Sequence, residues 1–410
     1  MKILKLFLVL ILVLSSAFQA QEKSFTLKVK NTIAKERIDA VVSISSKEIA
    51  AAHSDFKLDE FSILDGAVEV PFQIEKHKTS GDLILVLLNI KPCETKELKF
   101  VIGQKPAKEF TNRTYAEIAM KKNLQHDGKK FRGTKFTNVN KLKVPAIHRD
   151  HDALFKYEGP GWESDKVGYR FYLDWRNATD IFGKRINGLV LKNVGVTDTV
   201  ANNDSYHNMQ DWGMDIFKVG TSLGIGSLGI FADGKVNMIS KTDSILCRVS
   251  KIGCIKSEIA TNYFGWLVGG KKYNVESRFT ITAGSRLTKH SVKIEGEPEN
   301  LVTGLAKYAG TNLTKLNPGD GWGYLALYGK QSLSGDNLGI AILFKKNDLI
   351  ELTEDAVSQI VKLKPAKGKL EYYFCAAWEQ EPGGIKTQEE FVKYLASVVE
   401  ELNNPITIEY

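Results

Sequence analysis

The sequence lacks the motifs that would place it in several common enzyme classes. It holds only four cysteines in 410 residues, and none has the C-x-x-C spacing of a metal or redox site. It contains no H-E-x-x-H helix or P-loop, so the activities tied to those motifs have no support. It also contains no block of Lys and Arg interleaved with aromatic residues, which argues against a nucleic-acid partner.

The sequence alone does not determine whether or how the cysteines pair. The four residues are Cys93, Cys247, Cys254 and Cys375. In an exported chain four cysteines allow three pairings, and Cys247 and Cys254 are close enough in sequence to staple a hairpin. Buried thiols are the alternative.

Long apolar runs are also absent after residue 20. The stretch before it has Lys2 and Lys5, then an apolar run, then small residues ending at Ala20. This pattern is typical of a secretory signal peptide, and its apolar run is short for a membrane span, which needs about 20 residues. We expect residues 1–20 to be removed near Ala20, the protein to be periplasmic or secreted, and no membrane span to be present.

The charge balance is mildly basic. Without residues 1–20 the formal net charge falls from +8 to +6, with 54 Lys and Arg against 48 Asp and Glu. Such an excess suits an anionic partner such as a uronate or sulfated glycan, and it equally suits plain solubility. The oligomeric state is not indicated.

Short alternating apolar runs separated by polar turns dominate the chain and predict a mainly β fold. Because strands follow strands with few helices between them, we expect stacked antiparallel sheets. We predict a small N-terminal β-sandwich over residues 21–110 and a main β-sandwich over residues 111–410 that carries the site. The main domain ends in a helix over 387–403, where Thr387 and Glu390 form a capping box.

Two glycine-containing stretches have local meaning. Asp233-Gly234 is a two-residue hairpin signal between two strand-like runs. Residues 224–229, GIGSLG, match the dinucleotide fingerprint, but a strand and a hairpin follow where that fingerprint needs a helix. We expect these glycines to let backbone or ligand approach a sheet closely.

Aromatic rings and charges gather in one run, residues 158–183, in a mixture that neither a core nor a solvated face favours. On a strand, alternate residues share a face. The set expected in the core is Tyr169, Phe171, Leu173 and Trp175. The set expected to face a ligand is Arg170, Tyr172, Asp174 and Arg176. Its two arginines could hold a carboxylate through paired hydrogen bonds; an outer face whose charges pair only with one another is the alternative.

A second run offers metal ligands. His148, His151 and Asp152 combine imidazole with carboxylate, which is reasonable chemistry for a divalent metal, the one candidate cofactor. A solvated loop is the alternative reading of the same residues.

A third run, residues 203–220, offers proton transfer. His207 titrates near neutral pH, and Tyr206 beside it can give or take a proton. A hydrogen-bonded structural histidine and a packed ring are the alternatives for these two residues.

The runs at 158–184 and 206–229 resemble the signature blocks of a domain-of-unknown-function family. Its members are exported proteins encoded in polysaccharide-utilisation loci of Bacteroidota. The resemblance covers most of the chain after residue 20 and implies a role in the breakdown of uronate glycans, with dehydratase activity on uronate-ended oligosaccharides. It also implies a β-sandwich related to those of polysaccharide lyases and mutarotase-like enzymes.

Together these features predict an enzyme that removes the C5 proton of a uronic acid in an acidic oligosaccharide and expels water or a sugar from C4. His207 is the expected base and Tyr206 or Tyr172 the expected acid, while Arg170 and Arg176, or a metal at His148 and His151, are expected to neutralise the carboxylate. The expected substrate-binding residues are Trp162, Asp174, Arg176, Trp212 and Lys218. The alternatives are a glycan-binding protein without catalysis and a glycoside hydrolase with paired carboxylates.

Overall fold

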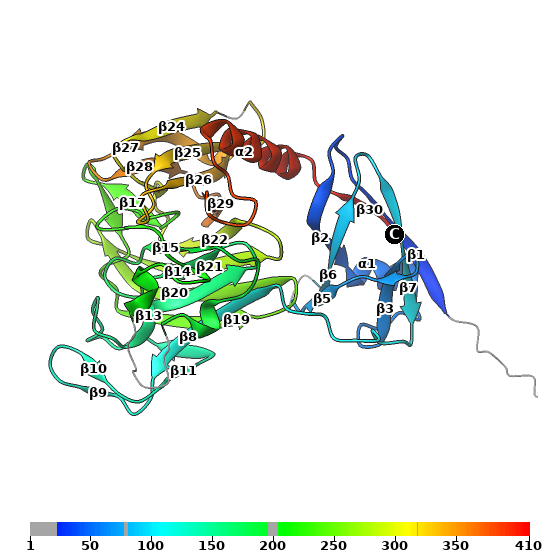
Figure 1. The fold of residues 1–410 in the computed structure, drawn as a ribbon, viewed down its shortest axis with the longest axis horizontal. Coiled ribbons are helices and arrows are strands. Elements are labelled where there is room, and N and C mark those ends of the chain that lie inside the picture. Colours follow the sequence, from blue (N-terminus) through cyan, green and yellow to red (C-terminus); the bar gives the residue numbers. More distant parts are fainter. Residues whose placement is uncertain (1–22, 78–80, 196–203, 318) are drawn as a thin grey trace, which may run out of the picture.

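The computed structural model describes residues 23–77, 81–195, 204–317 and 319–410, and the predicted signal peptide lies outside them. Antiparallel sheets dominate this part of the chain (Figure 1). They form a small body from the N-terminal strands and a larger body from most of the rest. The prediction of a mainly β fold with a C-terminal helix is confirmed. No helix in the described ranges is long and apolar enough to cross a membrane.

The small body consists of two sheets around a core of their own. Its elements are β1 (Ser24–Lys30), β2 (Arg37–Ser45), α1 (Ser46–Ala52), β3 (Phe61–Asp65), β4 (Val68–Glu69), β5 (Phe72–Glu75), β6 (Leu83–Ile90), β7 (Thr95–Ile102) and β30 (Thr407–Glu409). One sheet has the order β30-β1-β7-β3-β4 and the other β2-β6-β5. Strand β1 alternates strictly, so Phe25, Leu27 and Val29 face the core, while the other four residues, Lys28 and Lys30 among them, face outward.

The chain returns to this small body at its C-terminal end. Strand β30 pairs with the edge of β1, with Lys28 opposite Glu409 and Lys30 opposite Thr407. The predicted boundary at residue 110 assigned this last strand to the main domain. Strand pairing places it in the N-terminal sheet instead, because β1 is an open edge that an extended segment can join.

The larger body has a nine-stranded sheet as one layer. In spatial order its strands are β12 (Lys141–Lys143), β19 (Ser244–Lys251), β20 (Lys256–Val268), β21 (Lys271–Thr282), β22 (Leu287–Glu295), β29 (Lys369–Trp378), β26 (Asn337–Lys345), β25 (Trp322–Lys330) and β24 (Thr311–Leu316). One face of this sheet forms the main core, with Ile340 and Phe344 pointing inward. The other face carries Ala341 and Leu343, which pack under a helix.

Two smaller sheets form the layer that covers the main core. The six-stranded sheet has the order β11 (Phe136–Asn138), β8 (Thr114–Lys121), β13 (Phe155–Ser164), β14 (Gly168–Phe171), β15 (Thr179–Lys184) and β16 (Gly213–Asp215). The five-stranded sheet has the order β18 (Lys235–Met238), β17 (Gly229–Ala232), β23 (Leu301–Ala306), β28 (Ser358–Leu363) and β27 (Leu349–Glu354). Side chains from all three sheets meet in one core, as expected for a sandwich.

The remaining elements are short, apart from the C-terminal helix. They are β9 (Gln125–His126), β10 (Phe131–Arg132), η1 (Leu191–Asn193), η2 (Asp204–His207), η3 (Lys346–Asp348) and α2 (Gln388–Asn403). The predicted capping box of α2 is confirmed: Thr387 accepts from the Glu390 amide while the Glu390 side chain accepts from the Thr387 amide. Phe391 and Leu395 bury its apolar face against the nine-stranded sheet.

Local predictions have mixed outcomes. Asp233 and Gly234 both have positive φ and join β17 to β18, which confirms the hairpin. Gly226 also has positive φ, and a Cβ there would lie 2.3 Å from the Phe374 ring, so this glycine permits close packing in the core. All four cysteines are free thiols in the structure, so the staple between Cys247 and Cys254 is not formed.

The predicted core set holds for Tyr169, Phe171 and Leu173 but fails at Trp175. Strand β14 ends at Phe171, and a turn follows before β15 begins at Thr179. Tyr169 and Phe171 do point into the core, but Trp175 lies on the turn and is 48% exposed. A strand-like face cannot continue once the backbone leaves the extended conformation.

Candidate functional site

The outer face of the six-stranded sheet carries a buried cluster of charged side chains. Alternation puts Tyr169 and Ile181 in the core and directs Arg170 and Asp180, which are paired across β14 and β15, to the opposite face. Asp215 joins them from β16. Arg170 Nη2 donates to Asp180 Oδ2 at 2.7 Å and to Asp215 Oδ2 at 2.6 Å, and Arg170 Nε donates to Asp180 Oδ2 at 2.9 Å.

One guanidinium therefore faces two carboxylates in a place that water does not reach. Burial, reinforced by the neighbouring Asp215 charge, raises the pKa of Asp180 to about 7. Burial opposes the charge on Arg170, but the surrounding acids outweigh it, Asp215 foremost, and raise the pKa of Arg170 above its ordinary value. Two carboxylates, those of Asp180 and Asp215, face the single positive charge of Arg170. The cluster therefore favours binding of a further proton, either on one of its own groups or on a neighbouring group.

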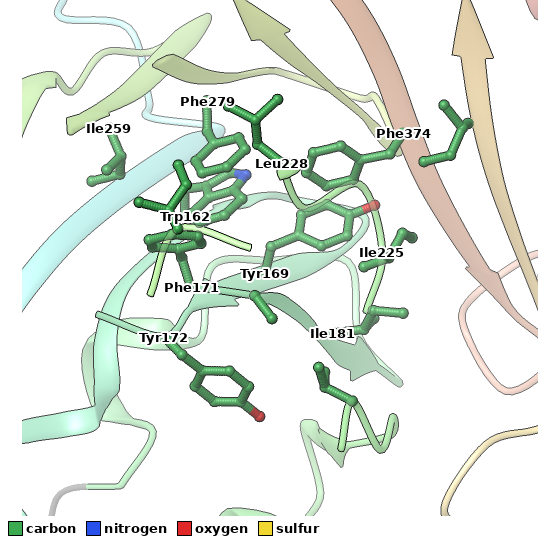
Figure 2. Close-up of a cluster of buried hydrophobic side chains, with 14 of the residues drawn as sticks. Trp162, Tyr169, Phe171, Tyr172, Ile181, Ile225, Leu228, Ile259, Phe279 and Phe374 are labelled. Carbon is green, nitrogen blue, oxygen red and sulfur yellow. The ribbon is translucent and has the colours of Figure 1, made fainter. Parts of the chain in front are cut away.

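Tyr172 and Glu158 extend the cluster. The Tyr172 hydroxyl donates to Asp180 Oδ2 at 2.5 Å and accepts from Arg170 Nη2 at 3.0 Å. Figure 2 shows its ring at the edge of the apolar cluster, with the hydroxyl directed away from Trp162 and Phe279. Glu158 Oε2 lies 3.6 Å from Arg170 Nη1.

Glu158 reaches the cluster because β13 is irregular there. Register with β8 shifts between Phe155 and Pro160, and Glu158 has a φ of 71°, the left-handed region. Bulges of this kind re-aim side chains, and non-glycine residues held at positive φ gather at functional sites. Burial opposes ionisation of Glu158, but the charges of Arg170 and Arg176 outweigh it and lower the pKa of Glu158.

His207 and Tyr206 complete the site from above the sheet. They lie on η2, and His207 Nδ1 is 3.0 Å from Asp215 Oδ2, the oxygen that Arg170 also holds. The Tyr206 hydroxyl accepts from Arg170 Nη1 at 3.4 Å, and its ring is 4.4 Å from the imidazole. Both residues line a pocket of about 60 Å3.

Four further residues line this pocket and give it its charge. They are Glu158, Lys130, Lys156 and His151. Lys156 is buried and paired with Glu117, whereas Lys130 is exposed. The pocket thus combines two imidazoles, the phenols of Tyr157 and Tyr206, one carboxylate and two lysines, which is a set suited to proton transfer on an anionic molecule.

Buried ion pairs fix the segment that covers this face. Lys184 Nζ lies 2.6 Å from Glu163 Oε2, and both side chains are fully buried. Glu163 also accepts from the backbone amides of Val190 and Leu191, while Lys156 donates to the Leu191 carbonyl at 2.6 Å. These bonds hold η1 against the sheet, so the surroundings of the charged cluster are well determined.

The structure brings together all four residues predicted to be catalytic. Arg170, Tyr172, Tyr206 and His207 lie in one connected network. Arg176 reaches the same network through Glu158, at 2.9 Å, and stacks 3.8 Å from the Tyr172 ring. Its own partner is Asp174, whose carboxylate is fully buried.

The expected carboxylate clamp is wrong in one respect. Arg170 and Arg176 were predicted to present their guanidinium groups to a ligand. Arg170 is almost fully buried, and its guanidinium group donates hydrogen bonds to Asp180, Asp215 and Tyr172. Desolvated arginines need such partners, so in this structure Arg170 organises the cluster and does not face the pocket opening.

None of the five predicted substrate-binding residues lines this pocket, and Asp174 and Arg176 are linked to it only through Glu158. Trp162 is fully buried between sheets, stacks 4.8 Å from Phe279 and donates to Thr288, so its prediction as a stacking platform is wrong (Figure 2). The rings of Trp212 and Phe182 pack together with their centroids 6.0 Å apart. Lys218 is exposed and lines neither of the pockets described here.

The predicted metal site does not assemble. His148 Nδ1 is bonded to Asp152 Oδ2 at 2.8 Å, whereas His151 lies beside Asp150 and Glu158 and is largely exposed. No group of three potential ligands lies close enough to hold an ion within the described ranges. The positive φ of His151 turns the chain between the two imidazoles and sends them to different neighbours.

Sequence reasoning missed the two acids that organise the site. Neither Asp180 nor Asp215 was among the predicted site residues. The signal for Asp180 was its spacing of ten residues from Arg170, which a β14–β15 hairpin converts into direct pairing. Asp215 had no such signal, because β16 follows a segment of nearly thirty residues after β15.

A family model described as Domain of unknown function (DUF4861) matches residues 29–408. The chain belongs to this family. The resemblance of its signature blocks to a domain-of-unknown-function family is thus supported by a match over most of the chain. This DUF4861 chain is 21% identical over 422 residues to uncharacterized protein P7 of Formosa agariphila, covering 96% of this chain and 95% of that protein.

Solved structures similar to this DUF4861 chain are much larger proteins. A protein in glycosyl hydrolase family 38 from Enterococcus faecalis matches with a TM-score of 0.45 and 8% identity over 94% of this chain and 47% of its own. An alpha-mannosidase from Enterococcus faecalis V583 matches with a TM-score of 0.47 and 8% identity over 94% of this chain and 46% of its own. The chain therefore spans about half the length of these structures.

Proposed function

We propose that this protein is a carbohydrate-active carbon–oxygen lyase that acts on a uronic acid unit of an acidic oligosaccharide. It removes the C5 proton and expels the C4 substituent, water or a sugar, to leave a C4–C5 double bond. The observation that carries the proposal is the contact between the half-exposed His207 imidazole and the buried Asp215 carboxylate at a pocket that also holds Tyr206.

His207 is the base in this proposal. Its Nδ1–H donates to Asp215 Oδ2, which fixes the tautomer and leaves the basic lone pair on Nε2. Asp215 also balances the charge that the ring gains when it takes the C5 proton. Because the charged cluster lacks one positive charge near neutral pH, it favours the imidazolium product of that step.

Tyr206 is the acid that protonates the leaving oxygen. Its hydroxyl sits beside Arg170 Nη1 at 3.4 Å, so the negative charge that develops as the proton leaves faces a permanent cation. Tyr172 serves a different purpose, since its hydroxyl is committed to Asp180. The acid and base thus come from adjacent residues of η2.

Lys130 is the cation that neutralises the substrate carboxylate in this proposal, because Arg170 and Arg176 are held by acids of the protein. Removal of the C5 proton puts charge on the substrate carboxylate, and a cation at that group lowers the barrier. Lys130 lines the pocket, is exposed and forms no ion pair within the described ranges. Arg170 and Arg176 contribute indirectly, by fixing Asp215 and Glu158.

Absorbance tests the proposal directly. Incubation with uronate-ended oligosaccharides is expected to produce the near-UV band of the conjugated C4–C5 double bond. The matched variant His207→Ala is expected to abolish this signal while keeping the fold, as judged by circular dichroism. New reducing ends without the band would replace elimination by hydrolysis, for which Glu158 and Asp215, both in contact with Arg170, are the paired carboxylates. Binding without either product would leave a glycan-binding protein.

A further inference from the structure

A second and much larger pocket is lined by Asp174, which is linked through Arg176 to Glu158 of the first pocket. It measures about 600 Å3 and lies where β12, β19 and the β20–β21 turn meet the turn between β14 and β15. We propose that this pocket binds one sugar unit that carries a negatively charged group. The proposal goes beyond the elimination and does not depend on it.

Two buried polar atoms at this pocket have no partner among the described residues. They are His148 Nε2 and Asn177 Oδ1, and both residues line the pocket. The His148 side chain is only 3% exposed, and buried polar groups are almost always hydrogen-bonded. His148 and Asn177 thus bring unused hydrogen-bonding capacity to the wall of this pocket.

The hydrogen-bonding character of His148 Nε2 and Asn177 Oδ1 determines which groups of a ligand could pair with them. Hydrogen bonds to His148 and to backbone amides outweigh the effect of burial and lower the pKa of Asp152, so its carboxylate stays charged and accepts the Nδ1 proton of His148. The tautomer that carries the proton on Nδ1 has its acceptor at Nε2. Asn177 uses its amide nitrogen for the carbonyls of Asp174 and Ile239, which leaves an acceptor at Oδ1. Two acceptors match two sugar hydroxyl groups.

An exposed indole supplies the apolar contact. Trp175 lines the pocket and is 48% exposed, although large aromatic side chains are normally buried. Leu267, also exposed, lies on the same lining. A pyranose ring has one face of C–H groups that packs on an aromatic plane while its hydroxyl groups point sideways to acceptors.

The charges at the rim favour an anion. Lys143 and Lys241 line the pocket and form no ion pair with any described residue. Lys272 is neutralised by Asp243 at 2.8 Å, and Asp174 is neutralised by Arg176. The two unpaired lysines therefore set the sign of the field, which attracts a carboxylate or a sulfate on the sugar.

Calorimetric titration tests this site with uronate oligosaccharides, sulfated oligosaccharides and neutral oligosaccharides of equal length as probes. We expect the acidic probes to bind at least 10-fold more tightly than the neutral one, and the uronate and sulfate arms to show which anion is preferred. Trp175→Ala is expected to weaken binding about 10-fold or more. Lys241→Gln is expected to weaken it several-fold and to reduce its salt dependence.

Controls separate this site from the elimination pocket. Ile350→Ala and Lys315→Gln remove an exposed apolar side chain and an exposed lysine on strands far from the pocket, and they should leave binding unchanged. Titrations with the uronate probe are made in the His207→Ala background, so that elimination cannot consume the probe. Unchanged affinity in both Trp175→Ala and Lys241→Gln would overturn the proposal, as would equal affinity for neutral and acidic probes. Absence of the double-bond signal would not affect it.

Discussion

The Nδ1 atom of His207 lies 3.0 Å from Oδ2 of Asp215, although the imidazole is 44% exposed and the carboxylate is almost fully buried. The same Asp215 oxygen accepts from Arg170 at 2.6 Å. An exposed titrating group is thus anchored to a fixed interior network. This arrangement lets the ring face a pocket while its tautomer and orientation are set from behind.

Asp215→Asn is expected to lower kcat/KM for elimination about 100-fold or more, because an amide cannot balance the imidazolium. The fall should appear mainly in kcat, with the pH profile displaced. Steady-state absorbance assays across pH measure both. The control is Asp211→Asn, an exposed acid of the same segment, which should behave as the wild type. Equal loss in both variants would show that Asp215 has no specific role.

Stability should depend on pH through Asp180. Its pKa is raised in the folded protein, so the folded state binds a proton more tightly than the unfolded chain does. Its contribution is therefore greatest at low pH and is lost as pH rises toward about 7. Asp180→Asn should remove this loss, which amounts to at most about 1.4 kcal/mol per pH unit. Urea unfolding at several pH values from 4.5 to 8 measures it; parallel curves for both proteins would contradict the prediction.

Lys184→Met is expected to lower the free energy of unfolding by about 3–5 kcal/mol, because it leaves the fully buried Glu163 without its cation. The matched control is Lys272→Met, which breaks an exposed pair with Asp243 and should cost no more than about 1 kcal/mol. Chemical denaturation of both variants tests the contrast. A small effect of Lys184→Met would mean that the backbone amides alone hold Glu163.

Truncation of Trp162 and of Trp175 should change the free energy of unfolding by very different amounts. Trp162→Ala is expected to cost about 3–5 kcal/mol of stability, since it opens a cavity between Phe279 and Tyr169. Trp175→Ala should change stability by less than about 1 kcal/mol, because its ring already faces water. Thermal unfolding of the pair checks this. Comparable losses would place Trp175 in a packed environment.

Several features followed from local sequence because their causes are local. The capping box at Thr387 and Glu390, the Asp233-Gly234 turn and the alternation of β1 each depend on residues within one turn or strand. Concentration of rings and charges in residues 158–183 likewise marked the site region. Its interpretation as one continuous strand was wrong, because nothing in the pattern reveals that β14 ends at Phe171.

Composition and short-range periodicity alone determined the β class, the main strands, the terminal helix and the neighbourhood of the site, because backbone preference and side-chain alternation act over a few residues. Tertiary pairing decided the rest. It joined β30 to β1, buried Trp162, turned Arg170 toward Asp180 and Asp215, and separated His148 from His151. Such outcomes depend on which distant segments meet and on the cost of burying charge, and both are properties of the assembled fold.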